Sequence, residues 1–211
     1  MIIAIDGPAA SGKGTISKGI ANHYNLPHLD TGLLYRAVGY AMLDKEKNED
    51  FEQVALDFAL SLDKSNLDPN ILGSLEVANA AAKVAKIEKV RLALRDYQTA
   101  FAKQQGGAIL DGRDIGTKIC PNADVKLFIT AKPQVRARRR SLQLLAKGGD
   151  VSESDILSQI IARDESDRAN KAGNFYKADD AHLLDTSKLD IEAALREAIT
   201  IVDEVMATKS E

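Results

Sequence analysis

A glycine-rich segment near the start of the chain has the residue types needed to hold phosphate groups. It follows an apolar run at residues 1–5 and reads Gly7-Pro8-Ala9-Ala10-Ser11-Gly12-Lys13-Gly14-Thr15. Small residues let the backbone curl so that its N–H groups point at phosphate oxygens, and Lys13 adds a positive charge for the outer phosphates. The helix expected to follow presents the positive end of its dipole to the same anions. These nine residues are therefore predicted to bind a nucleoside triphosphate.

One position departs from the phosphate-loop pattern G-x-x-x-x-G-K-[ST]. Gly14 stands where the pattern has a hydroxyl, and the hydroxyl comes one residue later, at Thr15. We therefore expect no direct metal ligand from the protein, with Mg²⁺ carried by the ATP phosphates and completed by water. An ordinary glycine-rich turn is the alternative. It is disfavoured because the preceding apolar run, the glycine spacing and the lysine occur together.

Arginines supply the other cations for phosphate chemistry. Phosphoryl transfer needs cations that gather phosphates in line and neutralise charge, and the planar guanidinium binds phosphate through two hydrogen bonds. In the run from Arg136 to Arg140, positions 136, 139 and 140 share a helical face, whereas Arg138 points elsewhere. One or two of this run are expected to reach phosphates. Arg163 lies four residues before Asp167, which is also the spacing of a surface ion pair.

Other nucleotide-dependent chemistries lack their sequence patterns. A switch GTPase needs an N-K-x-D base reader and a D-x-x-G loop, and neither string occurs. A motor-type ATPase usually carries a catalytic Glu after the acidic residue that ends a strand, but here Gly112 follows Asp111. The sequence therefore favours a kinase over a hydrolase or a switch.

Two further segments place polar residues where a ligand is expected. Asp30 and Thr31 follow a predicted strand and open a helix, so they are either helix caps or ligand contacts. Arg36, about a turn further along, lies either on the solvated surface or at a phosphate. Arg113 and Asp114 follow another predicted strand. Open α/β sheets bind ligands at the carboxyl ends of their strands, which favours the functional interpretation.

Five segments in order resemble bacterial cytidylate kinases over nearly the whole chain. They are the loop at 7–15, Leu29-Asp30-Thr31-Gly32-Leu33-Leu34-Tyr35-Arg36, Glu76-Val77-Ala78-Asn79-Ala80-Ala81, Asp111-Gly112-Arg113-Asp114-Ile115-Gly116-Thr117, and Arg163-Asp164 through Asp167. The G-K-G-T variant of the loop looks like that of nucleoside monophosphate kinases. The resemblance implies an ATP-dependent phosphotransferase that moves the γ-phosphate of ATP to CMP or dCMP, with Mg²⁺ accompanying the ATP.

The resemblance also implies roles for individual residues. The catalytic residues it implies are Lys13, Arg136, Arg140 and Arg163. The CMP-binding residues it implies are Asp30, Thr31, Tyr35, Arg36, Arg91, Arg113, Asp114, Arg163 and Asp167. Arg91 and Asp114 are placed at the base, since an arginine suits cytosine O2 and N3 and a carboxylate suits its N4 amine. Asp167 is expected to hold ribose hydroxyls, with Arg163 orienting it. For Arg91, a surface pair with Glu88 or Asp96 is the alternative.

Three departures from the family concern the acceptor site. Ala82 stands where family members usually have a serine hydroxyl near the cytosine. Asn170 stands where they have a further arginine, for which Arg168 or Lys171 could substitute. Residues 63–74 are too short for the small β-rich insert of bacterial members. The first two concern the tightness of acceptor binding, and the third concerns the shape and closing of that region.

Alternating apolar runs and helical segments predict how these residues are positioned. Strands are expected at residues 1–5, 26–29, 108–110, 125–130 and 182–184, with helices between them, for example at 13–24 and 133–146. This rhythm predicts an α/β fold with a parallel sheet flanked by helices, and the resemblance implies the five-stranded core of a P-loop kinase. The core takes residues 1–30 and 105–211. Residues 31–104 form an inserted helical unit, which the resemblance implies binds the nucleoside monophosphate.

Local signals add smaller elements. A short lid is expected at about 140–160, around the turn Lys147-Gly148-Gly149-Asp150. Ser152 with Asp155 predicts a capping box that opens the next helix. The last helix should bury a stripe made of Ile191, Leu195, Ala198, Val202 and Val205.

Composition narrows the class of protein. With 211 residues, 45% of them apolar and 28% charged, the chain suits one soluble globular core. A net charge of −3 gives no basic field for nucleic acid, and no apolar run is long enough for a membrane span. We expect a cytoplasmic monomer whose single Cys120 has no redox role. A small-metabolite kinase of the shikimate or gluconate type and a nucleotide-binding module without turnover are the alternative functions.

Overall fold

A five-stranded parallel sheet forms the centre of the molecule in the computed structural model, which describes residues 1–45, 49–63, 67–146, 148–170, 172–173 and 175–209. The strands are β1 (Ile2–Asp6), β2 (His28–Asp30), β3 (Ala108–Gly112), β4 (Val125–Thr130) and β5 (His182–Asp185). Their order in the sheet is β2-β3-β1-β4-β5, and every neighbouring pair is parallel. The predicted α/β fold with a parallel sheet is confirmed.

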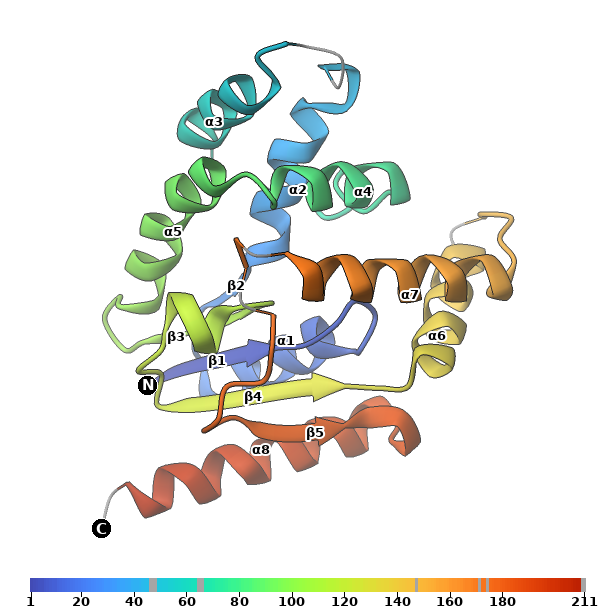
Figure 1. Ribbon diagram of the computed structural model, residues 1–211. Helices are drawn as coiled ribbons and strands as arrows, with labels where there is room; N and C mark the ends of the chain where they lie inside the picture. Colours follow the sequence, from blue (N-terminus) through green and yellow to red (C-terminus); the bar gives the residue numbers. More distant parts are fainter. Residues whose placement is uncertain (46–48, 64–66, 147, 171, 174, 210–211) are drawn as a thin grey trace.

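Side chains that alternate along β1 are buried on the two opposite faces of the sheet. From β1, Ile3 and Ile5 pack with α1 (Lys13–Tyr24) and α8 (Ile191–Thr208), whereas Ala4 faces the opposite cluster. Figure 1 shows α8 along the β5 side of the molecule. The buried stripe of α8 consists of Ala194, Ala198 and Val202, while Ile191 is 66% exposed. Leu195 and Val205 of the predicted stripe also pack against the cluster that contains Ile3 and Ile5, so the prediction is wrong only at Ile191, the first residue of the helix.

Helices occupy the chain between β2 and β3. These are α2 (Thr31–Ala41), the short η1 (Leu43–Lys45), α3 (Phe51–Ser61), α4 (Leu75–Val84) and α5 (Glu88–Ala102). No strand occurs in the described part of this stretch, and Figure 1 shows it rising above the sheet. Leu34 and Val38 of α2 and Val90 and Leu94 of α5 join the same core cluster as Ala4. The insert is therefore packed onto the core through α2 and α5.

Two helices that pack against each other, α6 (Pro133–Ala146) and α7 (Glu153–Ala169), follow β4 along the chain. In Figure 1, α7 passes between the sheet and the inserted helices. The predicted capping box is wrong, because the Ser152 side chain makes no cap hydrogen bond and instead lies 2.6 Å from Ser154 Oγ. Lys147 of the predicted lid turn and Lys171 lie outside the described residues. None of the described helices is long and apolar enough to cross a membrane.

Candidate active site

The glycine-rich loop joins the end of β1 to the start of α1. Gly7 is required by close approach, because a Cβ there would lie 2.0 Å from the carbonyl oxygen of Ile129 on β4. Gly12 caps α1 with φ +91°, a conformation that favours glycine. Glycine has no side chain that could cap the helix, so N–H groups at the start of α1 are left for an anion. The backbone thus has the form that phosphate binding needs.

Every residue predicted to bind CMP lines one pocket at the carboxyl edge of the sheet. The residues come from the end of β2, from α2, α5 and α7, and from the segment after β3, and Lys13, Ala9 and Ala10 of the loop line the same pocket. Ala82 and Asn170, the two positions that depart from the family, also line it. Arg168 is exposed and does not line this pocket, so it does not replace the missing arginine.

Two ion pairs connect the recognition groups of this pocket to one another. Arg91 of α5 pairs with Asp114 rather than with Glu88 or Asp96, and its guanidinium lies 5.5 Å from the Tyr35 ring centroid. Although burial opposes it, the charges of Tyr35 and Asp114 raise the pKa of Arg91. The second pair joins Arg113 Nε to Asp167 Oδ2 at 2.8 Å. A ligand that uses these groups must replace the internal pairs.

The start of α2 combines structural and pocket-lining roles. The Asp30 carboxylate accepts a hydrogen bond from Gly32 N at 2.9 Å, so the capping interpretation holds while Asp30 also lines the pocket. Thr31 Oγ1 donates to the Asp111 carbonyl at 2.8 Å. Arg36 donates to the Leu72 carbonyl at 2.7 Å, and burial lowers its pKa. These contacts fix the side chains against β3 and the insert.

Lys13 lies beside a buried carboxylate that sequence reasoning left as structural. Lys13 Nζ is 3.6 Å from Asp111 Oδ1, and His28 Nε2 is 2.7 Å from Asp111 Oδ2. Burial alone would raise the pKa of Asp111, but the His28 hydrogen bond and the Lys13 charge lower it. Burial and the nearby Arg113 charge lower the pKa of Lys13. This cluster joins β2, β3 and α1, so spacing along the chain could not reveal it.

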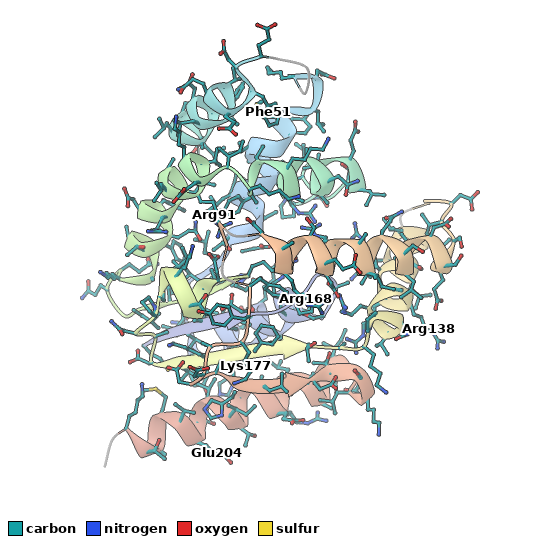
Figure 2. All side chains as sticks on the ribbon, viewed as in Figure 1. Phe51, Arg91, Arg138, Arg168, Lys177 and Glu204 are labelled. Carbon is teal, nitrogen blue, oxygen red and sulfur yellow. The ribbon has the colours of Figure 1, made fainter. Side chains whose placement is uncertain are left out.

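The arginines of α6 take different positions from one another. Arg136 is 2% exposed and donates to Asp164 Oδ1 at 3.0 Å and to the Ala9 carbonyl at 3.1 Å. It does not line the pocket of the predicted CMP-binding residues. Its contacts instead connect α6 with α7 and the loop. Its predicted catalytic role stays a prediction. Arg140 reaches the Gly73 carbonyl at 3.4 Å and lines a neighbouring pocket with Arg36. Arg138 is exposed, as its helical position predicts (Figure 2).

Arg163 does not pair with Asp167, although their four-residue spacing allows an ion pair. The Asp167 carboxylate is taken by Arg113, and Arg163 Nε is buried with no hydrogen-bond partner among the described residues. Burial and the nearby Arg113 charge lower the pKa of Arg163 to about 10. A buried cation with an unsatisfied donor, in a pocket that also holds Lys13 and Arg36, suits an anionic ligand.

A second pocket lies on the other side of the loop and was missed by sequence reasoning. Its walls come from the loop, the start of α1, α6, Thr186 and the start of α8. Arg139 of α6 donates to Thr186 Oγ1 at 2.9 Å, and Thr186 donates to the Ser11 carbonyl at 3.1 Å. Both pockets share Ala10, Lys13 and Asp30. Two ligands bound there would meet at Lys13.

A phosphate loop in a parallel α/β sheet, with two pockets meeting at its lysine, defines a nucleotide kinase of the P-loop type. A family model described as cytidylate kinase matches residues 3–204, and the chain belongs to this family. It is 53% identical over 207 residues to a cytidylate kinase of Rhodopseudomonas palustris, covering 98% of each chain. It is 50% identical over 206 residues to one of Brucella suis, covering 98% of this chain and 94% of that protein.

Comparison with solved structures supports the fold alone. The crystal structure of an uncharacterized protein from Eubacterium ventriosum aligns with a TM-score of 0.57 at 16% sequence identity. The alignment covers 96% of this chain and 98% of that chain. The arrangement of strands and helices is therefore shared well beyond the range of sequence similarity.

Proposed function

We propose that this chain transfers the γ-phosphoryl group of ATP to CMP or dCMP, giving ADP and CDP or dCDP. The observation that carries the proposal is the pairing of Arg91 with Asp114 in the first pocket. Lys13 lines both this pocket and the second one on the other side of the loop. The printed names of the relatives, cytidylate kinase, support the same acceptor. A small-metabolite kinase gives no reason for this pair and is not favoured, and a non-catalytic module gives no reason for two pockets that meet at one lysine.

Cytosine matches the pair of side chains in the acceptor pocket. Its O2 and N3 accept hydrogen bonds, which suits Arg91, and its N4 donates, which suits the Asp114 carboxylate. Uracil presents O4 at the same place and would face the carboxylate with another acceptor. Such an unpaired contact costs about 1–3 kcal/mol, which corresponds to roughly ten- to a hundredfold in kcat/KM.

The transfer itself requires little covalent work from the protein. An oxygen of the acceptor phosphate forms a bond to the γ-phosphorus, and the bond from that phosphorus to the β–γ bridging oxygen breaks, releasing ADP. Lys13 and the loop hold the ATP phosphates. Arg36, Arg140 and Arg163 lie along the neighbouring pockets and are proposed to neutralise charge on the transferring group.

Magnesium fits the donor set at the loop when it is carried by the nucleotide. The Asp111 Oδ1 atom is buried without a hydrogen-bond partner among described residues, and Asp30 lines both pockets. No group of three His, Cys, Asp or Glu side chains gathers into a metal site in the described chain. Mg²⁺ keeps several waters and needs only one or two carboxylates beside substrate phosphates. Asp30 and Asp111 would hold it through such waters, and it would neutralise phosphate charge.

The inserted helices and the α6–α7 pair are proposed to act as moving parts. Residues 31–104 carry Tyr35, Arg36 and Arg91 over the acceptor pocket, and the region at about 140–160 forms a lid. The 3.4 Å contact from Arg140 to the Gly73 carbonyl joins these two regions directly. Closing them over two bound nucleotides would exclude water from the transferring phosphate.

The ratio of CMP to UMP efficiency tests base recognition. An Asp114→Asn side chain presents either an N–H₂ or a carbonyl, so the discrimination against uracil should relax by about 1 kcal/mol or more. Asp96→Asn, an exposed carboxylate on α5, is the matched control and should leave the ratio unchanged. Measuring kcat/KM for CMP and UMP in the three proteins decides it. An unchanged ratio in Asp114→Asn contradicts the proposed reading of the base.

A further inference from the structure

The chain that leaves α7 closes one side of the acceptor pocket on its way back to β5. Gly173 and Phe175 line the pocket, and Figure 1 shows this segment descending from the end of α7. Two contacts fix its beginning: Lys118 Nζ donates to the Ala172 carbonyl at 2.8 Å, and the Asn170 side-chain amide donates to the Ala85 carbonyl at 3.2 Å. The segment is thus tied to both the core and the insert.

The Phe175 ring lies between the sheet and the Arg113 guanidinium. Its centroid is 5.8 Å from that of Phe128 on β4, with the two rings tilted by 32°. On the other side, Arg113 Cζ lies 5.6 Å from the Phe175 centroid. This separation is within the range of a cation–π interaction, in which the face of the ring attracts the cation. Phe128 therefore supports a ring that in turn supports Arg113.

Arg113 needs support because its neighbours in the pocket are cations. Lys13, Arg36 and Arg163 line the same pocket, and their mutual repulsion favours turning the Arg113 side chain out toward water. The pair with Asp167 opposes this, but both partners are partly exposed, at 24% and 18%, and such pairs contribute little. An acceptor that uses Asp167 would also remove it from Arg113. The ring contact does not depend on Asp167.

We propose that Phe175 is a positioning residue, which holds the Arg113 guanidinium in the acceptor pocket so that its N–H groups face the monophosphate of the incoming nucleotide. The inference rests on the proposed function. A guanidinium attracted to a ring face is held in place while its N–H groups remain free to donate to a phosphate. The contact acts before the acceptor arrives and lowers the cost of ordering this side chain on binding.

Three variants separate the ring's electrostatic contact from its bulk. Phe175→Leu keeps an apolar side chain and loses the aromatic face, whereas Phe175→Tyr keeps the face. We expect Phe175→Leu to raise the KM for CMP and the Kd of CMP without ATP by about three- to tenfold, the range of one such contact. The KM for ATP and kcat should stay within about twofold, and Phe175→Tyr should behave as wild type. Tyr176→Leu, a neighbouring exposed aromatic, is the matched control and should change neither constant.

A double-mutant cycle with Arg113 completes the test. In an Arg113→Ala background the Phe175→Leu change should have no further effect on CMP affinity, because the two changes remove the same contact. Additive effects, a Phe175→Tyr variant as weak as Phe175→Leu, or a Phe175→Leu variant with wild-type CMP affinity would each overturn the inference. Wild-type protein that fails to phosphorylate CMP contradicts the proposed function itself. Wild-type activity with any of the other three results contradicts this inference alone.

Discussion

Lys13 lines both pockets and is surrounded by charged side chains. Burial and neighbouring cations lower its pKa, while the carboxylates of Asp111 and Asp30 oppose that shift. The side chain lies where the two pockets meet, beside the first turn of α1. Under the proposed function, its charge acts on the outer phosphates of the donor and on the group being transferred.

Replacing this lysine should remove catalysis and leave the fold. Lys13→Met keeps the length of the apolar stem and removes the charge, so we expect kcat to fall at least about a hundredfold. Circular dichroism and the melting temperature should show a folded protein. A folded variant with near-normal turnover would contradict the role of Lys13.

Asp167 tests the sugar specificity of the acceptor site. If it holds the ribose 2′-hydroxyl, CMP gains a charge-assisted hydrogen bond of about 1.5–3 kcal/mol that dCMP lacks. Asp167→Ala should then lower kcat/KM for CMP more than for dCMP and bring the two values together. The structure offers a competing role, because Asp167 pairs with Arg113. Equal losses for CMP and dCMP would show that Asp167 acts only through Arg113.

Asp6 predicts a pH dependence of stability. Burial raises its pKa from 3.8 to about 6, although hydrogen bonds from Gly116 N and Ile115 N lower it. The folded state therefore binds this proton more tightly than the unfolded state. The contribution of Asp6 to the free energy of unfolding is greatest below pH 4 and falls by about 3 kcal/mol as the pH rises through 6.

Denaturant unfolding at several pH values measures how the contribution of Asp6 to the free energy of unfolding changes with pH. The difference in unfolding free energy between wild type and Asp6→Asn should shift in favour of the variant as the pH rises from 4 to 7. Glu88→Gln, an exposed acid on α5, provides the control for general charge effects. A difference that stays constant over this range would mean that Asp6 does not titrate as predicted.

At the scale of elements, one buried ion pair joins α6, α7 and the phosphate loop. Arg136 and Asp164 are 2% and 5% exposed, and Arg136 also donates to the carbonyls of Ala9 and Ala131. Removing one partner of a buried pair leaves an uncompensated charge, whereas removing both leaves an apolar contact. The pair thereby sets the position of α7, which carries Arg163 and Asp167.

The double replacement of this pair should therefore lower the free energy of unfolding less than the single replacement does. Arg136→Met should lower the free energy of unfolding by about 3–5 kcal/mol, and Arg136→Met with Asp164→Leu should recover much of that loss. Arg138→Met, an exposed position on the same helix, should change it by no more than about 0.5 kcal/mol. Equal losses in the single and double variants would contradict an uncompensated charge as the cause.

The sequence was most informative about the positions of strands and helices. It was least informative about contacts between side chains that lie far apart along the chain. Short apolar runs predicted all five strands, with β4 at its observed bounds and β2 two residues early, because Leu26 and Pro27 extend the apolar run beyond the paired strand. The helical spacing of Arg163 and Asp167 left a surface ion pair open as an alternative, and that pair does not form. Arg113 reaches Asp167 from a different element, 54 residues away, and no local spacing encodes such a contact.

The same limit applies to the candidate site. The acceptor residues could be predicted because each stands in a short motif that resembles the family, and the structure brings all of them to one pocket. The second pocket, with Arg139 and Thr186, depends on how α6 and α8 meet the loop. His28 likewise reaches Asp111 only because β2 and β3 pair in register.

At the scale of the whole molecule, two pockets on either side of the loop meet at one lysine. The loop and α1 belong to the sheet core, while the acceptor pocket is completed by the inserted helices and by α7 (Figure 1). This arrangement suits transfer between two bound nucleotides, one in each pocket.

The measurement that tests the central claim most directly is ADP release at fixed ATP with different acceptors. The panel consists of CMP, dCMP, UMP, AMP, shikimate and no acceptor. The account predicts the highest kcat/KM with CMP and dCMP, at least about tenfold above UMP, and little release without an acceptor. Strong activity with shikimate, or no activity with any acceptor, would contradict it.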